Sequence, residues 1–332
     1  MHERAPSFRT PPEQISTQQL ARYVQGWLVD GQANHLSPKT MEARRMVTDK
    51  LLWFLRQEER EHCGRVEIRE FLAYLNTGHL QPDGRWRTGR PNDHLPVKAR
   101  TTQLYFANLR VFFRWLVEEE ALAVSPFDTL KQPINHQDQI QPYTEEQIQA
   151  LLEAARQGRS PKRDEALIMF MLDSGCRAGE VCGLQIKDVD LAGRFCRVTG
   201  KGNRQRTVYI GSTTGRAMWQ CIKLSDGEPF TPVFRAEHNR FAGHALTVNG
   251  LRQVVHRLGR KAGIESARCS PHTFRHTFAI SFLRNGGNVF TLKELLGHST
   301  LAICNKYVRL AQADMENQHR QFSPVDRLKR RR

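Results

Sequence analysis

Apolar residues recur at helix-compatible spacing through most of the first 120 residues. Ser37 and Pro38 stand before one such segment, 40–57, as an N-cap and a first-turn proline, and they predict that a helix begins there. Two further helices are predicted over 67–75 and 97–121. The apolar side chains of the segment 40–57 are Met46, Leu51, Leu52, Phe54 and Leu55, and its basic side carries Arg44, Arg45 and Lys50. The apolar stripe of 97–121 consists of Leu104, Leu109, Phe112, Phe113, Leu116 and Val117. The first half is therefore predicted to be a small all-helical bundle with a basic face.

Polar stretches interrupt this pattern in two places. The segment 76–96 contains several glycines and prolines, and a loop of that length is uncommon unless it has a function or is disordered. The segment 125–142 is rich in proline, glutamine and other polar residues, which is typical of a domain boundary.

Beyond that boundary, helical and strand-like patterns are mixed. Thr144 and Gln147 have the spacing of a capping box and predict a helix start, and 165–172 is apolar enough for a buried helix. Between 195 and 210 the period changes to that of two strands, FCRVTG and RTVYI, which a short KGNRQ turn joins into a hairpin. Helical patterns then continue to about residue 318, and the chain ends in a basic run, RLKRRR.

These patterns predict a mainly α chain with a small β-sheet, divided into a helical domain and a mixed α+β domain. The predicted parts are a disordered tail over 1–14, a helical domain with a basic face over 15–125, a linker over 126–142, the mixed domain over 143–318 and a basic tail over 319–332.

The charge balance indicates the chemical class of a partner. Fifty Lys and Arg against thirty-four Asp and Glu leave a net charge of +16, which favours a polyanion such as DNA. The seven cysteines are scattered and never spaced as C-x-x-C, which argues against a disulfide framework and a thiolate zinc site. The longest apolar run, 166–172, is far shorter than the ~20 residues that span a bilayer. We therefore expect a cytosolic protein with no membrane partner.

Two short segments of the second half carry basic residues in unusual settings. In SGCRAGE, Arg177 follows a glycine, and Glu180 stands three positions later, where it can orient the guanidinium. In TGKGN, Lys201 lies between two glycines at the hairpin tip and lacks the pattern of a nucleotide-binding loop. By itself the first is compatible with an ordinary surface ion pair, and the second with an exposed turn lysine.

The segment PHTFRHTF, 271–278, is more specific. Its proline can begin a helix on which His272 and Arg275 share one face. His272 and His276 also have the i, i+4 spacing of a zinc pair, but no H-E-x-x-H glutamate and no obvious third ligand stands nearby. We therefore expect no metal.

The last two elements follow in order. In LLGHS, Gly297 can end one helix, so that His298 lies at a tight turn. Tyr307 stands nine residues after His298. Taken singly, such a histidine usually caps or packs, and such a tyrosine usually belongs to the core.

The full set, however, resembles the tyrosine recombinase family, which includes phage integrases, Cre and the Xer resolvases. Members carry an arginine in T-G-x-R-x-x-E, a lysine on a β-hairpin, H-x-x-R, L-G-H and a tyrosine nine residues after that histidine. This sequence has SGCRAGE, TGKGN, HTFR, LLGHS and Tyr307 in the same order. The resemblance is strong over 143–312, and the first half is more loosely similar to the family's SAM-like core-binding domain.

The resemblance implies a DNA strand transferase that needs no cofactor. Tyr307 would attack the scissile phosphate and form a 3′-phosphotyrosyl link. Arg177 and Arg275 would stabilise the charge that develops on the non-bridging oxygens.

The remaining implied roles concern protons and the phosphate. Lys201 would protonate the leaving 5′ oxygen, His272 would assist proton transfer, and His298 would hydrogen-bond the phosphate. Candidate DNA contacts of the first half are Lys39, Thr40, Arg44, Lys98, Arg100 and Thr101.

The family also implies partners and a setting. These are double-stranded DNA at specific recombination sites, self-association into a tetramer on paired sites, conceivable accessory DNA-bending proteins, and the nucleoid of a bacterial cytoplasm. The process would be integration or excision, or the resolution of a mobile element, plasmid or chromosome.

Two alternatives stay open at this point. A type IB topoisomerase uses a similar residue set to relax supercoils, but the spacing from L-G-H to the tyrosine and the helical first half favour a recombinase. A catalytically silent DNA-binding protein is disfavoured, because all six candidate catalytic residues are present.

Overall fold

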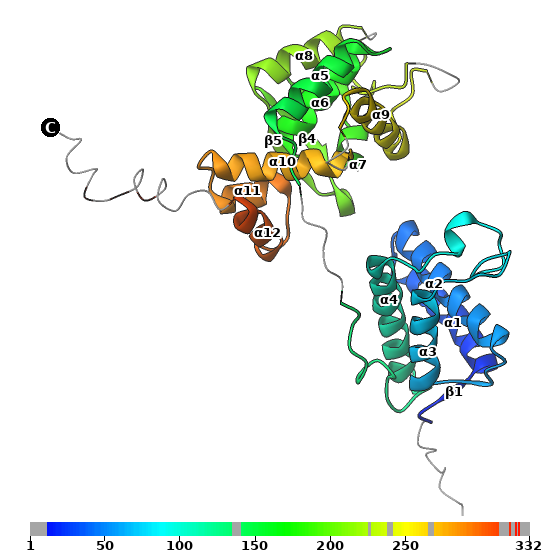
Figure 1. Cartoon of the computed structure of the whole chain (residues 1–332). Helices are drawn as coiled ribbons and strands as arrows, with labels where there is room; N and C mark the ends of the chain where they lie inside the picture. Colours follow the sequence, from blue (N-terminus) through cyan, green and yellow to red (C-terminus); the bar gives the residue numbers. More distant parts are fainter. Residues whose placement is uncertain are drawn as a thin grey trace, which may run out of the picture. The chain divides into compact units, whose positions relative to one another are not determined.

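The computed structural model describes residues 12–134, 141–224, 227–237, 242–264 and 269–311, together with 319, 323 and 325. The side chain of Lys201 is not among the described parts. The predicted tails over 1–14 and 319–332 lie almost wholly outside the described residues, as do residues 135–140 of the predicted linker. The chain forms two compact units, Met1–Asp138 and Gln139–Arg332 (Figure 1).

The first unit is built from four long helices. They are α1 (Thr17–Ala33), α2 (Pro38–Gln57), α3 (Arg65–Asn76) and α4 (Ala99–Glu118). A pair of two-residue antiparallel strands, β1 (Ile15–Ser16) and β2 (His62–Cys63), adds a short sheet that the sequence pattern did not indicate.

The predicted helices of this unit are confirmed, with ends that differ by at most three residues. At the start of α2 the side chain of Ser37 accepts a hydrogen bond from the backbone N–H of Thr40, and Pro38 occupies the first turn. The helices predicted over 67–75 and 97–121 are α3 and α4.

The four helices share one core, and α4 contributes a continuous stripe to it. Its buried members are Thr102, Tyr105, Phe106, Leu109, Phe112, Phe113 and Leu116. The sequence analysis was wrong to place Leu104 on this stripe, because its side chain is 41% exposed. Leu104 and Val111 are seven residues apart on a strip of α4 beside the buried face, and both are exposed. Met46 of α2 is likewise 37% exposed.

The polar segment 76–96 is an irregular loop, with a single 3₁₀ turn at Pro91–Asp93. Its anchor is Arg85, which is 2% exposed and donates hydrogen bonds to the backbone oxygens of Thr77 and Leu95. Trp86 packs edge-on against Trp53 of α2, with ring centroids 5.4 Å apart. Arg85 therefore joins the two ends of the loop, and the contact of Trp86 with Trp53 holds the loop against α2.

The second unit combines eight helices with one small sheet among its described residues (Figure 1). The helices are α5 (Glu145–Arg156), α6 (Pro161–Ser174), α7 (Ala178–Cys182), α8 (Ser212–Ile222), α9 (Val248–Lys261), α10 (Pro271–Arg284), α11 (Val289–Leu296) and α12 (Ala302–Ala311). The strands are β3 (Val189–Asp190), β4 (Phe195–Thr199) and β5 (Gln205–Tyr209), paired antiparallel in the order β3-β4-β5.

Local predictions for this unit are also confirmed. Thr144 and Gln147 form the capping box that begins α5. The hairpin is β4–β5, with Thr199 paired to Gln205 and a 3₁₀ turn, Lys201–Asn203, at its tip. The apolar segment 165–172 lies within the buried helix α6.

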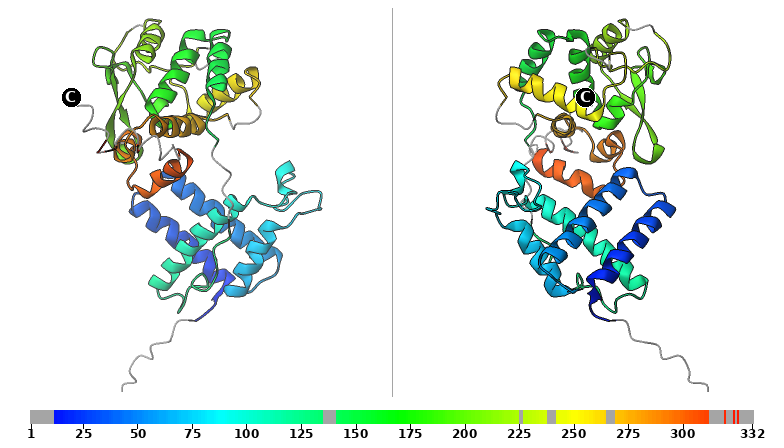
Figure 2. Two further views of the ribbon diagram at one scale, coloured as in Figure 1. Left: turned by 60° about the vertical axis from the view of Figure 1, so that its left-hand side comes forward. Right: turned by 90° about the vertical axis from the view of Figure 1, so that its right-hand side faces the viewer.

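Two hydrophobic clusters hold the second unit together. The larger one joins α5, α6, α8 and α9 to the hairpin and includes Phe274 of α10. The smaller one lies among α10, α11 and α12, which are neighbours in both orientations of Figure 2. Its buried members are Ala279, Ile280, Leu283, Leu292, Leu296, Tyr307 and Ala311.

The fold class predicted from the sequence, mainly α with a small β-sheet, is confirmed. No helix in the described part of the chain has the length and apolar character that crossing a membrane requires.

The core stripe of α4 predicts a contrast between two identical substitutions. Leu109→Ala removes a fully buried side chain and is expected to lower the free energy of unfolding by about 2–5 kcal/mol. Leu104→Ala, on the same helix but exposed, is expected to cost less than about 0.5 kcal/mol. Urea denaturation followed by tryptophan fluorescence measures this, because Trp27, Trp53, Trp86 and Trp115 all lie in the first unit. Equal losses for the two variants would contradict the assigned core face.

Candidate active site

Arg177 lies at the turn between α6 and α7, where Gly175 ends α6 with a φ of 59°. Its Nη1 donates to Oε1 of Glu180 at 3.1 Å, and its Nη2 donates to the backbone oxygen of Gly297 at 3.0 Å. Glu180 is buried and also accepts the backbone N–H of Arg177 at 2.7 Å. The carboxylate therefore orients the arginine, as the three-residue spacing predicted, while the side chain of Arg177 stays 41% exposed.

Arg275, on α10, is buried to 2% exposure. Its guanidinium donates from Nη1 to the backbone oxygen of Gly175 at 2.8 Å and from Nη2 to that of Leu296 at 2.7 Å. Both oxygens lie at C-terminal helix ends, of α6 and α11, where the helix dipole favours a cation. Burial lowers the pKa of Arg275 to about 10, with the nearby charge of Arg177 acting in the same direction. The guanidinium is still charged at neutral pH.

His298 follows Gly297, whose φ of 61° ends α11. Its Nε2 accepts a hydrogen bond from Nη2 of Arg275 at 2.8 Å, since a guanidinium can only donate. The hydrogen of the neutral ring is then on Nδ1, which faces Sγ of Cys304 at 3.2 Å. Burial, followed by the charges of Arg275 and Arg177, lowers the pKa of His298 to about 4. His298 is therefore neutral at physiological pH.

Tyr307, on α12, is 1% exposed. Its hydroxyl lies 2.9 Å from Nδ1 of His276, and its ring is nearly parallel to that of His298 at a centroid distance of 6.4 Å. Burial raises the pKa of Tyr307 to about 12, although the charge and hydrogen bonding of Arg275 oppose the rise. The phenol is therefore protonated at neutral pH.

The structure thus brings together four of the six predicted catalytic residues: Arg177, Arg275, His298 and Tyr307. His272 is exposed on the first turn of α10, with its ring 4.6 Å from that of His276. The backbone of Lys201 lies at the hairpin tip, but its side chain is outside the described parts, so its predicted role stays a prediction.

Sequence reasoning missed two residues of this site. His276 was considered only as a zinc partner of His272, although it directly follows Arg275 in the motif. Arg206, on β5, donates to Oε2 of Glu180 at 3.0 Å and to the backbone oxygen of Leu295 at 3.0 Å. No spacing in the sequence indicated Arg206, because its partners are 26 and 89 residues away. Among the described residues, no three His, Cys, Asp or Glu side chains are placed to hold a metal ion.

The candidate DNA contacts of the first unit have varied surroundings. Lys39, Lys98, Arg100 and Thr101 are exposed, the last three at the N-terminal end of α4. Arg44 is partly engaged within the unit, because its guanidinium lies 4.0 Å from the ring centroid of Trp27. The hydroxyl of Thr40 pairs with that of Ser37 at 2.8 Å.

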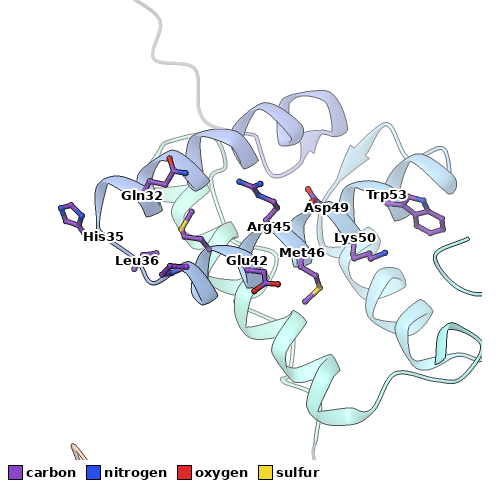
Figure 3. A pocket seen from close by; sticks show the side chains of 11 residues that line it. Gln32, His35, Leu36, Glu42, Arg45, Met46, Asp49, Lys50 and Trp53 are labelled. Atoms are coloured by element: carbon purple, nitrogen blue, oxygen red, sulfur yellow. The ribbon is translucent and has the colours of Figure 1, made fainter. Parts of the chain in front are cut away.

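An open groove runs along α2 of the first unit (Figure 3). Side chains of both charges line it, including Glu42, Arg45, Asp49 and Lys50, with Trp53 at one end. The candidate catalytic residues all belong to the second unit, so this groove is not the site of the predicted chemistry.

Comparisons with known proteins identify the family of the chain. Residues 142–314, more than half of the chain, match the Phage integrase family. Tyrosine recombinase XerC of Actinobacillus pleuropneumoniae serotype 7 is 34% identical over 228 residues, which are 68% of this chain and 72% of that protein. Tyrosine recombinase XerD of Pseudomonas putida is 30% identical over 285 residues, which are 78% of this chain and 91% of that protein.

Solved structures share the fold at low sequence identity. The Tn1549 transposon integrase in complex with a circular intermediate DNA has a TM-score of 0.70 and 19% identity, over 95% of this chain and 99% of that chain. A lambda integrase dimer bound to a COC′ core site has a TM-score of 0.64 and 14% identity, over 86% and 96% of the two chains. Taken with the family match and the 34% identity to a XerC protein, the site geometry leads to one conclusion: this chain belongs to the phage integrase family of tyrosine recombinases.

Proposed function

We propose that Tyr307 is the nucleophile with which this tyrosine recombinase cleaves and rejoins DNA, through a 3′-phosphotyrosyl intermediate. Enzymes of this family perform site-specific recombination, and the comparisons favour neither a topoisomerase nor a silent DNA-binding protein. The observation that carries the proposal is the meeting of two guanidiniums, Arg177 and Arg275, around the backbone of Leu296 and Gly297, with Tyr307 beside Arg275.

The charges of this site fit a phosphoryl transfer that needs no metal. Attack on a phosphodiester builds negative charge on the non-bridging oxygens, and fixed cations stabilise that charge in the transition state. Arg275 is already held by backbone oxygens, so little reorganisation is needed when a phosphate arrives. Arg177 is partly exposed and can reach the same phosphate with parallel N–H groups.

The other roles rest on the motifs and their positions. Lys201, at the hairpin tip, would protonate the leaving 5′ oxygen, and His272, exposed at the start of α10, would assist proton transfer. His298 would donate a hydrogen bond to the phosphate once Arg275 releases Nε2 and the ring takes the tautomer with its hydrogen on Nε2. Because the phosphotyrosyl link conserves the energy of the broken bond, a 5′-hydroxyl can reverse the attack.

The buried state of Tyr307 implies a movement before cleavage. Its side chain is 1% exposed, so a phosphate can reach the hydroxyl only after the residues that cover it shift while the hydroxyl keeps its place beside His276. The small cluster that holds α12 is separate from the larger core of the unit, which makes such a shift inexpensive.

The partners follow from the family and the charge. The proposed substrate is double-stranded DNA at specific sites, where the first unit adds phosphate contacts through Lys39, Thr40, Arg44, Lys98, Arg100 and Thr101. Four copies on two sites, accessory DNA-bending proteins and a bacterial, nucleoid-associated setting complete the proposal. The XerH recombinase and the Tn1549 integrase, two structural neighbours, are seen bound to DNA. The biological process is integration or excision of a mobile element, or resolution of a plasmid or chromosome.

The nucleophile is tested with a nicked duplex that traps the covalent product. The duplex carries a site that the wild-type chain selects from a randomised library. Wild type, in EDTA, is expected to give a protease-sensitive protein–DNA band on a denaturing gel, and Tyr307→Phe none. A band that persists in Tyr307→Phe would overturn the assignment, while DNA binding by this variant serves as the folding control.

The transition-state role of Arg177 predicts a large and specific loss. Arg177→Ala is expected to slow formation of the covalent band by about 100- to 1000-fold, as when one donor to a developing oxyanion is removed. Arg216→Ala, an exposed arginine of α8 in the same unit, controls for the loss of a positive charge and is expected to change the rate less than threefold. Similar losses for both variants would indicate a general electrostatic effect instead.

The pKa shifts predict an unusually broad pH profile. With a pKa of about 4, His298 stays neutral until well below its ordinary value of 6.5, and the lowered pKa of Arg275, about 10, removes its charge only at high pH. At limiting DNA, where the rate reports the free enzyme, cleavage should be level from about pH 5 to 9 and fall on either side. A decline that begins near the ordinary histidine pKa would contradict this expectation.

A further inference from the structure

One partner of the Tyr307 hydroxyl is a histidine to which the family motifs assign no role. Nδ1 of His276 lies 2.9 Å from the hydroxyl oxygen, and the two ring centroids are 5.5 Å apart. His276 is on α10, immediately after Arg275, and so belongs to the same rigid helix as the phosphate-binding arginine.

The direction of this hydrogen bond follows from the charges around it. His276 is neutral, because burial and then the positive charges of His272, Lys306 and Arg275 lower its pKa to about 3. Arg275 can only donate to the phenolic oxygen, so the single hydrogen of the phenol is free to point at His276. Nδ1 of His276 is therefore the acceptor.

Other acceptors are poorly placed. Nε2 of His298 already accepts from Arg275, and its Nδ1 faces Cys304. The ring of His298 also lies parallel to the tyrosine ring instead of pointing at the hydroxyl. Tyr307 itself is 1% exposed, which leaves little access for water.

From this geometry we propose that His276 is a catalytic residue that accepts the phenolic proton of Tyr307 during attack on DNA. The inference rests on the proposed nucleophile and extends it. As the bond from the tyrosine oxygen to phosphorus forms, the bond from phosphorus to the 5′ oxygen breaks. The phenolic proton moves to Nδ1 of His276, and the leaving 5′ oxygen takes a proton from the general acid, for which Lys201 is proposed. Rejoining returns both protons.

The surroundings of His276 explain why the transfer waits for DNA. The groups that face the ring are His272 and Arg275 on its own helix and Lys306 and Tyr307 on α12, and none of them is an anion. An imidazolium is therefore unfavourable until the phosphate brings negative charge beside Arg275. In the free protein the proton stays on the tyrosine, and the nucleophile is inactive.

Two substitutions separate proton transfer from positioning. In His276→Asn the side-chain amide can take the place of Nδ1 and accept the hydrogen bond, but an amide oxygen is far too weak a base to take the proton. His276→Ala removes both functions. We expect both variants to form the covalent band about 100- to 10,000-fold more slowly than wild type on the nicked duplex. Added imidazole should restore part of the rate of His276→Ala.

A second substrate distinguishes a base from an acid. A duplex with sulfur in place of the bridging 5′ oxygen has a leaving group that needs no proton, so it should restore cleavage by Lys201→Ala. It should not restore cleavage by His276→Asn, because the phenolic proton must still be removed. The matched control is His256→Asn, an exposed histidine of α9, which should behave as wild type on both substrates.

Three results would overturn the inference: wild-type cleavage by His276→Asn, faster cleavage by either variant, or rescue of His276→Asn by the sulfur substrate. The first two results would mean that His276 only holds the tyrosine in place and does not take its proton. DNA affinity and the thermal midpoint of each variant, expected to match wild type, show that the fold is intact. Tyr307→Phe separates the two proposals, because its inactivity supports the nucleophile whatever the His276 variants do.

Discussion

The second unit depends on how a buried cation is stabilised. Moving a guanidinium out of water costs several kcal/mol unless hydrogen bonds replace its hydration. Arg275 replaces its hydration with hydrogen bonds to two backbone oxygens at the ends of different helices, and His298 is a third acceptor. These bonds offset the cost of burying the charge. The same bonds tie α10 to α6 and α11, so the charge proposed to serve the chemistry also fixes the arrangement of the site.

Two glycines make this arrangement possible. Gly175 and Gly297 have φ values of 59° and 61°, a region that other residues rarely adopt. Each ends a helix so that backbone oxygens turn toward an arginine. A Cβ on Gly175 would collide with Phe278, and one on Gly297 would lie 3.0 Å from the side chain of Arg206. Glu180 completes the frame, because it binds both Arg177 and Arg206.

Features that depend on neighbours in sequence could be predicted, and those that depend on distant partners could not. The caps at Ser37 and Thr144 and the β4–β5 hairpin follow from local chemistry. The exposure of Leu104 was missed because helical spacing shows that α4 has an apolar face but does not show how many neighbouring positions that face buries. His276 was missed because the hydroxyl that it contacts belongs to Tyr307, 31 residues away. Arg206 was missed because its hydrogen-bond partners are 26 and 89 residues away. The motif residues came from the family resemblance, since each has a common structural explanation when taken singly.

The separation of the two hydrophobic clusters has a consequence for how unwanted cleavage of DNA is avoided. The residues proposed to hold a phosphate are fixed by helix ends, whereas the proposed nucleophile lies on α12, in a small cluster that α12 shares with α10 and α11. Under the proposed function, a copy that meets arbitrary DNA holds its backbone without cutting it. Cutting then requires a second event, exposure of the tyrosine hydroxyl, which only a correctly assembled site needs to provide. Such a chain would search long stretches of DNA while leaving every strand it touches intact.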